Sequence, residues 1–153
     1  VGDNHVRFCE LMAQAFKRAD IIITSGGLGP TYDDMTKEAV CDFLGVKTVL
    51  DEEALRRMTE FFKKRGRPMT ENNKKQALVP EGAYVFQNDN GTAPGICAEK
   101  DGKYIIMLPG PPGELCPIFE EEILPFGPKG TSMNYNEAIR TMTVSAMTFP
   151  GQG

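Results

Sequence analysis

The sequence has little of what several common kinds of functional site require. Its 153 residues include one histidine, His5, which we expect to be solvated, so a histidine-dependent catalytic triad is not predicted. The four cysteines are far apart and form no C-x-x-C pair, which argues against a zinc site and a redox motif. We expect them to be small buried hydrophobic side chains in a reducing compartment: Cys9, Cys41, Cys97 and Cys116.

Positive charge and long hydrophobic runs are also scarce. Lysine and arginine total 17 against 21 acidic residues, a net charge of −4, so neither a nucleic-acid partner nor a polybasic membrane patch is expected. No apolar run approaches the ~20 residues that a membrane-spanning helix needs. The chain shows no secretory signal, and we therefore expect a cytoplasmic protein.

Hydrophobic periodicity and turn residues predict alternating helices and strands. The expected helices lie at about 4–18, 32–44, 52–65, 71–77 and 113–122, and the expected strands at 21–24, 46–50, 84–87, 96–99, 104–108 and 141–146. The pair Asp101-Gly102 between two β-type runs predicts a hairpin. Together these elements predict an α/β fold with a mainly parallel central sheet plus an antiparallel β-hairpin.

The most informative segment is a glycine-rich loop after an apolar run at 21–23. Gly26, Gly27 and Gly29 stand between that run and Thr31, where a helix is expected to begin. Glycines lack a Cβ and a helix N-terminus carries unpaired N–H groups, so such a loop can bind a phosphate through its backbone. The loop lacks the lysine of a P-loop and the spacing of a dinucleotide fingerprint, and a tight strand-to-helix turn is the alternative.

Two carboxylates, Asp33 and Asp34, follow these glycines at the expected helix start. They could hold a metal ion or accept a proton beside a bound phosphate. Thr31-x-x-Asp34 also resembles a capping box with Asp in place of Glu, and both carboxylates suit the positive end of a helix. A helix cap and a functional carboxylate therefore both remain open for Asp34, and one does not exclude the other.

The polar loop at 88–95 is a second candidate for ligand binding. It offers amide, hydroxyl and backbone groups, among them Asn90 and Thr92, that suit ribose or phosphate. A plain turn between strands is the alternative.

A third loop, at 109–113, is stiffened by proline and again follows a strand-like run. Pro109, Gly110 and the following Glu114 could form one wall of a pocket, although the loop could also serve packing alone. Ligands of open α/β sheets bind at the carboxyl ends of strands. We therefore expect the loops at 25–34 and 109–113 to share one rim.

Five segments stand in an order that is specific to one family. They are TSGGLGPTYDD (24–34), ENNKKQA (71–77), PEGA (80–83), NGTAPG (90–95) and LPGPPGEL (108–115). Over about residues 1–125 the chain resembles the N-terminal molybdopterin-binding-type domain of the competence/damage-inducible protein A (CinA) family.

This resemblance implies a fold and an activity. The fold would be the three-layer α/β/α arrangement of the MoaB and Mog proteins, in which the loop matching Gly26–Gly29 receives a pterin phosphate. The residue matching Asp34 would act with Mg²⁺ or another divalent cation. In CinA-type domains the implied reaction is metal-dependent cleavage of ADP-ribose to AMP and ribose 5-phosphate.

Other parts of the sequence depart from that family. Its domain normally starts earlier, with a strand and a further acidic residue, and many members carry a C-terminal amidase domain. We therefore expect residues 1–127 to form a domain that lacks its first strand, and residues 128–153 to be a segment of uncertain assignment.

The leading hypothesis is hydrolysis of a nucleotide pyrophosphate such as ADP-ribose. Asp34, helped by Asp33, would be catalytic, and Asp34 would hold the metal. The expected substrate-binding residues are Gly26, Gly27, Gly29, Thr31, Asn90, Thr92, Pro109, Gly110 and Glu114. The alternatives are a molybdopterin-binding adenylyl transferase and a non-catalytic nucleotide-binding oligomerisation module. By resemblance the partner is a small nucleotide or pterin, and the chain is expected to form a homo-oligomer, a dimer or trimer.

Overall fold

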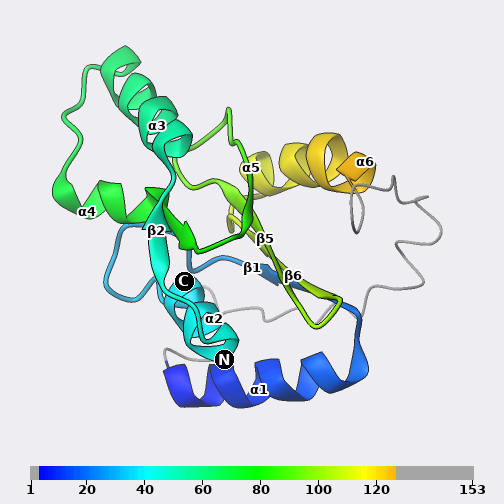
Figure 1. The fold of residues 1–153 in the computed structure, drawn as a ribbon. Helices are drawn as coiled ribbons and strands as arrows, with labels where there is room; N and C mark the ends of the chain where they lie inside the picture. The colour runs from blue at the N-terminus through cyan, green and yellow to red at the C-terminus, as the bar shows by residue number, and fades with distance from the viewer. Residues whose placement is uncertain (1–3, 127–153) are drawn as a thin grey trace, which may run out of the picture.

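The computed structural model describes residues 4–126, in which helices and strands alternate (Figure 1). The helical segments are α1 (His5–Arg18), α2 (Thr36–Leu44), α3 (Glu52–Lys64), α4 (Glu71–Lys74), the 3₁₀ turn η1 (Lys75–Ala77), α5 (Pro112–Pro117), the π-helical segment η2 (Ile118–Ile123) and α6 (Leu124–Phe126). The strands are β1 (Ile21–Ser25), β2 (Thr48–Leu50), β3 (Leu78–Pro80), β4 (Tyr84–Phe86), β5 (Gly95–Lys100) and β6 (Lys103–Leu108). The strand predicted at 141–146 lies outside the described residues.

Side-chain caps fix several helix ends where the sequence predicts them. The Asn4 carboxamide accepts a hydrogen bond from the Arg7 N–H at 3.1 Å, and the Asp51 carboxylate accepts one from the Ala54 N–H at 2.7 Å. Gly45 ends α2 in the left-handed region at φ 70°, which glycine adopts without steric cost.

The start of α2 differs from the prediction of a helix from residue 32. The helix begins at Thr36, whose N–H donates to the Gly27 carbonyl at 3.2 Å and whose hydroxyl donates to the Gly26 carbonyl at 3.0 Å. These bonds tie the first helical residue back to the glycine loop. Residues 31–35 form a separate turn, so the acidic pair precedes the helix instead of opening it.

The central sheet has the strand order β1-β6-β5-β4. Strands β1 and β6 pair in parallel, whereas β5 pairs antiparallel with both β6 and β4. Asp101 and Gly102 join β5 to β6 with φ values of 54° and 74°, the left-handed backbone of a two-residue hairpin turn. The α/β class and the predicted hairpin are confirmed.

Alternate residues of β6 point to opposite faces of the central sheet. Each face packs against its own helices, so the fold has three layers. Ile105 and Met107 pack in one hydrophobic cluster with Met12 of α1 and Val40 of α2. Residues of the other parity pack against the helical segment after β6: Tyr104, Ile106 and Leu108 lie in one cluster with Ile118 and Ile123. Helices α1 and α2 therefore cover one face and α5–η2 the other (Figure 1), as predicted for a three-layer fold.

A smaller unit stands beside the main sheet. Strands β2 and β3 form a separate antiparallel pair, and α3 packs through Ala54 and Met58 against Ala77 of η1. The sequence does not predict β3, because a three-residue strand that ends in proline shows no alternating pattern. This unit places α4 and η1 next to the start of α2.

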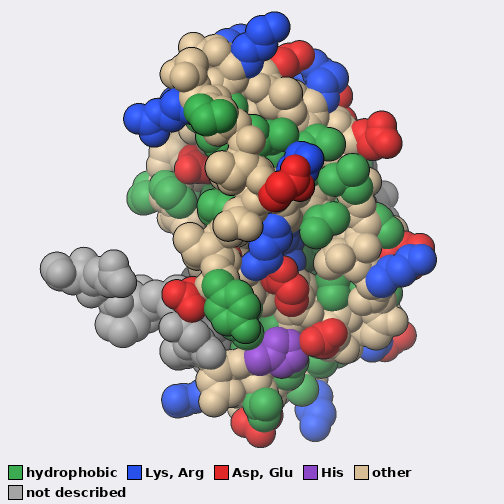
Figure 2. Space-filling model, turned by 90° about the vertical axis from the view of Figure 1, so that its left-hand side faces the viewer, with side chains coloured by type: hydrophobic (Ala, Val, Ile, Leu, Met, Phe, Trp, Pro, Cys, Tyr) green, Lys and Arg blue, Asp and Glu red, His purple; other side chains and the backbone are tan. Residues whose placement is uncertain are grey.

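The surface formed by the described residues carries no large patch of one charge in the view of Figure 2. Figure 2 shows a face on which acidic and basic side chains are interspersed with hydrophobic ones. Within residues 4–126, no helix is both long and apolar enough to cross a membrane. Cys41 and Cys97 are buried as predicted and Cys9 is half-buried, but Cys116 is exposed because it lies on the solvent side of α5.

Candidate functional site

The glycine loop and the proline loop line one pocket of about 280 Å³ at the carboxyl ends of β1 and β6. The rim shared by these two loops is therefore confirmed. Gly110 lies against Gly26: a Cβ added at Gly110 would be 3.5 Å from the Gly26 Cα. The residues that line this main pocket are Gly26, Gly27, Leu28, Gly29, Asp34, Gln76, Thr92, Ala93, Pro109, Gly110, Pro111 and Glu114.

The glycine loop turns sharply where β1 ends. The Gly26 N–H donates to the Leu108 carbonyl at 2.9 Å, so that amide is already used by the neighbouring strand. Gly27 has φ 70°, and a Cβ there would overlap the Thr36 hydroxyl. Among the described residues, no hydrogen bond uses the amides of residues 27–29. These three N–H groups are the donors that the loop can offer to an anion.

Asp34 belongs to the turn that faces this loop. Its Oδ2 atom accepts hydrogen bonds from the Thr31 N–H, at 2.9 Å, and from the Thr31 hydroxyl. A Cβ at Gly29 would lie 2.5 Å from the same oxygen, so only glycine leaves room for the carboxylate. Asp34 therefore holds the turn and lines the pocket, and it does not cap α2. Asp33 is exposed and does not line the pocket.

Two lysines whose place at the site the sequence does not predict, Lys37 and Lys75, lie next to the turn that contains Asp34. The Lys75 ammonium donates to the carbonyls of Asp34, at 2.8 Å, and Thr31, at 3.3 Å, and lies 3.3 Å from Glu38 Oε1. The Lys37 ammonium donates to the Lys75 carbonyl at 2.5 Å. Lys37 is 2% exposed, and this burial lowers its pKa to about 8.

The hydrophobic periodicity of α2 indicates that Lys37 is buried. It stands three and four residues before Val40 and Cys41, on the buried face of α2. A lysine on such a face needs a partner, but the sequence does not indicate that the partner is a carbonyl of η1.

Glu114 forms the opposite wall at the start of α5. Its Oε2 atom accepts a hydrogen bond from the Asn88 carboxamide at 2.7 Å, and the same carboxamide donates to the Ala93 carbonyl at 2.9 Å. A Cβ at Gly91 would overlap the Glu114 carboxylate. The loop at 88–95 is thus closed around this side chain.

The binding residues predicted from sequence do not all reach the main pocket. Thr92 lines it, as do Pro109 and Gly110, whereas Asn90 is exposed and Thr31 acts through Asp34. Sequence reasoning missed Gln76, a buried residue of η1 that lines the pocket, although the motif at 71–77 contains it.

The charges of the main pocket are unbalanced. Asp34 and Glu114 line it, and no lysine or arginine is among its lining residues. A phosphate ligand would therefore meet carboxylates with no positive side chain at the surface, and a cation would relieve that repulsion.

The donor set suits a hard divalent cation that arrives with a phosphate. Among residues 4–126, no three His, Cys, Asp or Glu side chains are grouped to hold a metal by themselves. Mg²⁺ typically uses one or two carboxylates plus substrate phosphate and water. Asp34 keeps Oδ1 free of the bonds that occupy Oδ2, and Glu114 keeps Oε1 free in the same way.

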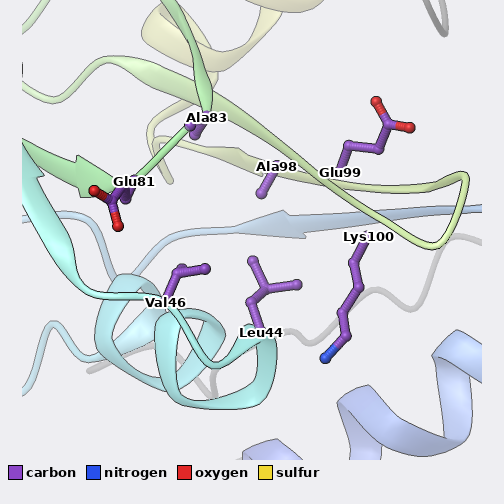
Figure 3. A pocket seen from close by; sticks show the side chains of 8 residues that line it. Leu44, Val46, Glu81, Ala83, Ala98, Glu99 and Lys100 are labelled. Carbon is purple, nitrogen blue, oxygen red and sulfur yellow. The ribbon is translucent and has the colours of Figure 1, made fainter.

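A second, smaller pocket of about 100 Å³ lies between the end of α2, the turn after β3 and strand β5 (Figure 3). Leu44, Val46 and Ala98 line its centre, and Glu99 points away from them in Figure 3. The Lys100 ammonium approaches the Phe43 carbonyl at 3.4 Å. This pocket lacks a group of converging polar side chains, so the main pocket is the candidate site.

His5 contacts two side chains, whereas the sequence predicts a solvated histidine. Its Nε2 atom lies 2.8 Å from Asp42 Oδ2, and its Nδ1 atom lies 3.8 Å from the Cys9 sulfur. Burial, and then the nearby Asp42, raise the pKa of the Cys9 thiol. A raised pKa disfavours the thiolate, so Cys9 is not an activated nucleophile despite its contact with His5.

Comparison with known proteins points to one family. Residues 1–129 match the family model described as "Probable molybdopterin binding domain". A "Putative competence-damage inducible protein" of Caldicellulosiruptor bescii is 58% identical over 126 residues, which cover 82% of this chain and 31% of that protein. Its counterpart in Thermoanaerobacter pseudethanolicus is 51% identical over 144 residues, which cover 94% of this chain and 34% of that protein.

A solved structure shows a similar fold. The crystal structure of the protein CinA with unknown function from Thermoplasma acidophilum has a TM-score of 0.69 and 34% sequence identity to this chain. The match covers 78% of this chain and 69% of the other. The chain spans about a third of the length of the curated relatives it matches.

Proposed function

We propose, since this chain belongs to the molybdopterin-binding domain family and is of the CinA type, that its main pocket binds and hydrolyses a nucleotide pyrophosphate. The proposed substrate is ADP-ribose or a similar nucleotide, and the products are AMP and ribose 5-phosphate.

One observation carries this proposal. The main pocket brings three unused backbone amides, those of residues 27–29, together with the carboxylates of Asp34 and Glu114. Unused backbone N–H groups in a glycine-rich loop are a common kind of phosphate site. The carboxylates add the hard oxygen ligands that a phosphate-bound cation prefers.

Each carboxylate is held in place before any ligand binds. Two hydrogen bonds from Thr31 orient Asp34, and one from Asn88 orients Glu114. Fixed groups of this kind lose little freedom on binding. A divalent cation, when bound, would neutralise the pyrophosphate and polarise its phosphorus–oxygen bonds. Asp34 would hold that cation, and Glu114 would orient the attacking water from the opposite wall.

Product analysis tests the proposal. The purified protein is incubated with ADP-ribose and Mg²⁺, and AMP and ribose 5-phosphate are measured in equal amounts by chromatography. We expect both products to appear. Tight binding of ADP-ribose without products would support a non-catalytic binding module instead.

The apolar part of the main pocket supports a second candidate, a molybdopterin-type ligand. Leu28, Ala93, Pro109 and Pro111 line the pocket beside the phosphate loop, and an apolar lining of this kind suits a flat ring. A molybdopterin-processing transferase would bind a pterin phosphate and transfer adenylate to it. Transfer without release of free AMP would favour this candidate over the hydrolase.

A further inference from the structure

We propose that Gln76 recognises the uncharged, hydrogen-bonding part of the ligand, a role that rests on the proposed function. Gln76 lies in η1, is 4% exposed and lines the main pocket. Its Oε1 atom is buried and has no hydrogen-bond partner. Buried side-chain oxygens nearly always have a partner, so an unpartnered one at a pocket indicates a group that the ligand supplies.

The backbone around Gln76 is fixed on both sides. The neighbouring Lys75 carbonyl accepts from Lys37, and the Ala77 carbonyl accepts from the Asp51 N–H at 2.9 Å. Ala77 also packs in the α3 cluster. The backbone of Gln76 is therefore held in place beside the pocket by bonds that do not involve its own carboxamide.

The chemistry of a carboxamide limits what can satisfy it. Whichever way the amide is turned, it offers one acceptor oxygen next to N–H donors. A phosphate at neutral pH is essentially an acceptor, so it cannot satisfy that oxygen. The complementary ligand group carries an O–H or N–H beside an acceptor, as a ribose diol and a nitrogen heterocycle both do.

Replacing Gln76 by methionine tests this role, because methionine has a similar size but cannot form these bonds. By titration calorimetry with Mg²⁺, Gln76→Met should weaken binding of the α,β-methylene analogue of ADP-ribose, which cannot be hydrolysed, about tenfold. Binding of inorganic pyrophosphate, which has no such group, should be unchanged. Equal weakening of both ligands, or of neither, would overturn the proposal.

Gln14→Met, an exposed change on α1, is the matched control and should leave both affinities unaltered. Ribose 5-phosphate and AMP then identify the group that is recognised. A Gln76→Met defect with ribose 5-phosphate assigns the hydroxyls of that sugar, and a defect confined to AMP assigns the adenosine part of the ligand.

Thermal stability without ligand separates this proposal from the proposed function. An unpartnered buried amide destabilises the free protein, so Gln76→Met should raise Tm by a few degrees. A lower Tm would show that the amide is structural and would overturn the inference. A wild-type protein that binds no ADP-ribose would overturn the proposed function, while the Tm comparison still decides whether the amide lacks a partner.

Discussion

At the scale of single residues, two adjacent carboxylates have different surroundings. Asp34 is bonded to Thr31 and lines the main pocket, whereas Asp33 is exposed and outside it. The sequence places both at the same expected helix start and cannot separate them. The direction of each side chain is decided by Gly29 and Thr31, which leave space and bonds for Asp34 alone.

Asp34→Asn should therefore reduce AMP release far more than Asp33→Asn. Asparagine can still accept the bonds from Thr31, so the turn should persist, but it lacks the charge that holds a cation. We expect a loss of about 100-fold in kcat/KM for Asp34→Asn, equivalent to about 3 kcal/mol of transition-state stabilisation. The comparison variant, Asp33→Asn, should change the rate less than about twofold. Equal losses would contradict the assignment.

Lys37 makes a prediction about stability and pH. Burial is the main cause of its lowered pKa, about 8 against an ordinary 10.5, with smaller effects from Glu38, Lys75, Cys41 and Asp34. Between these two values the unfolded chain binds more protons than the folded one. The contribution of Lys37 to the free energy of unfolding should therefore rise from pH 8 to pH 10.5.

Urea unfolding of wild type and Lys37→Met at pH 7 and pH 10 measures this effect. The stability of wild type relative to the variant should increase by roughly 3 kcal/mol across that range. The exposed substitution Lys17→Met should show no such change. A pH-independent difference for Lys37→Met would show that its amine titrates normally in the folded chain.

At the scale of elements, glycines in the loops around the main pocket leave space that neighbouring side chains occupy. Gly27 admits the Thr36 hydroxyl, Gly29 admits the Asp34 carboxylate, and Gly91 admits the Glu114 carboxylate. Two of these three glycines thus make room for the acidic groups of the main pocket. A Cβ added at Gly29 or Gly91 should therefore displace the carboxylate that the proposed reaction needs.

Gly91→Ala should displace Glu114 or open the loop at 88–95. We expect AMP release to slow about tenfold or more, since small shifts of a positioned group cost rate. Gly113→Ala is the matched control on α5, where an added Cβ meets no atom within 4 Å. It should preserve activity and stabilise the fold by up to about 1 kcal/mol. Normal activity in Gly91→Ala would contradict a role for Glu114.

The sequence predicts the elements that local signals specify. The helix starts expected near residues 4 and 52, the helix end expected near residue 44 and the Asp101-Gly102 turn depend on neighbours in the chain, and the structure confirms them. The start of α2 and strand β3 depend on contacts with distant segments, and the sequence misses them. The candidate site is predicted only in part for the same reason. The glycine loop is a local sequence pattern, but Lys75, Gln76 and Asn88 come close to it only through contacts between distant segments.

At the scale of the whole molecule, the main pocket exists because β1 and β6 are parallel neighbours. Their carboxyl ends bring loops from the two halves of the described chain to one rim, and the β2–β3 unit adds Gln76 from a third direction. The result is a concave site with backbone donors, two carboxylates and no basic side chain among its lining residues. A pyrophosphate in this site requires a positive charge that the lining residues do not supply.

The dependence of ADP-ribose binding on a divalent cation tests this central claim most directly. Binding of the α,β-methylene analogue of ADP-ribose, which cannot be hydrolysed, is measured by titration calorimetry with the same protein in Mg²⁺ and in EDTA, at constant ionic strength. We expect a dissociation constant at least about tenfold lower with Mg²⁺, because the cation offsets repulsion by Asp34 and Glu114. Equal affinity in Mg²⁺ and in EDTA would contradict this claim.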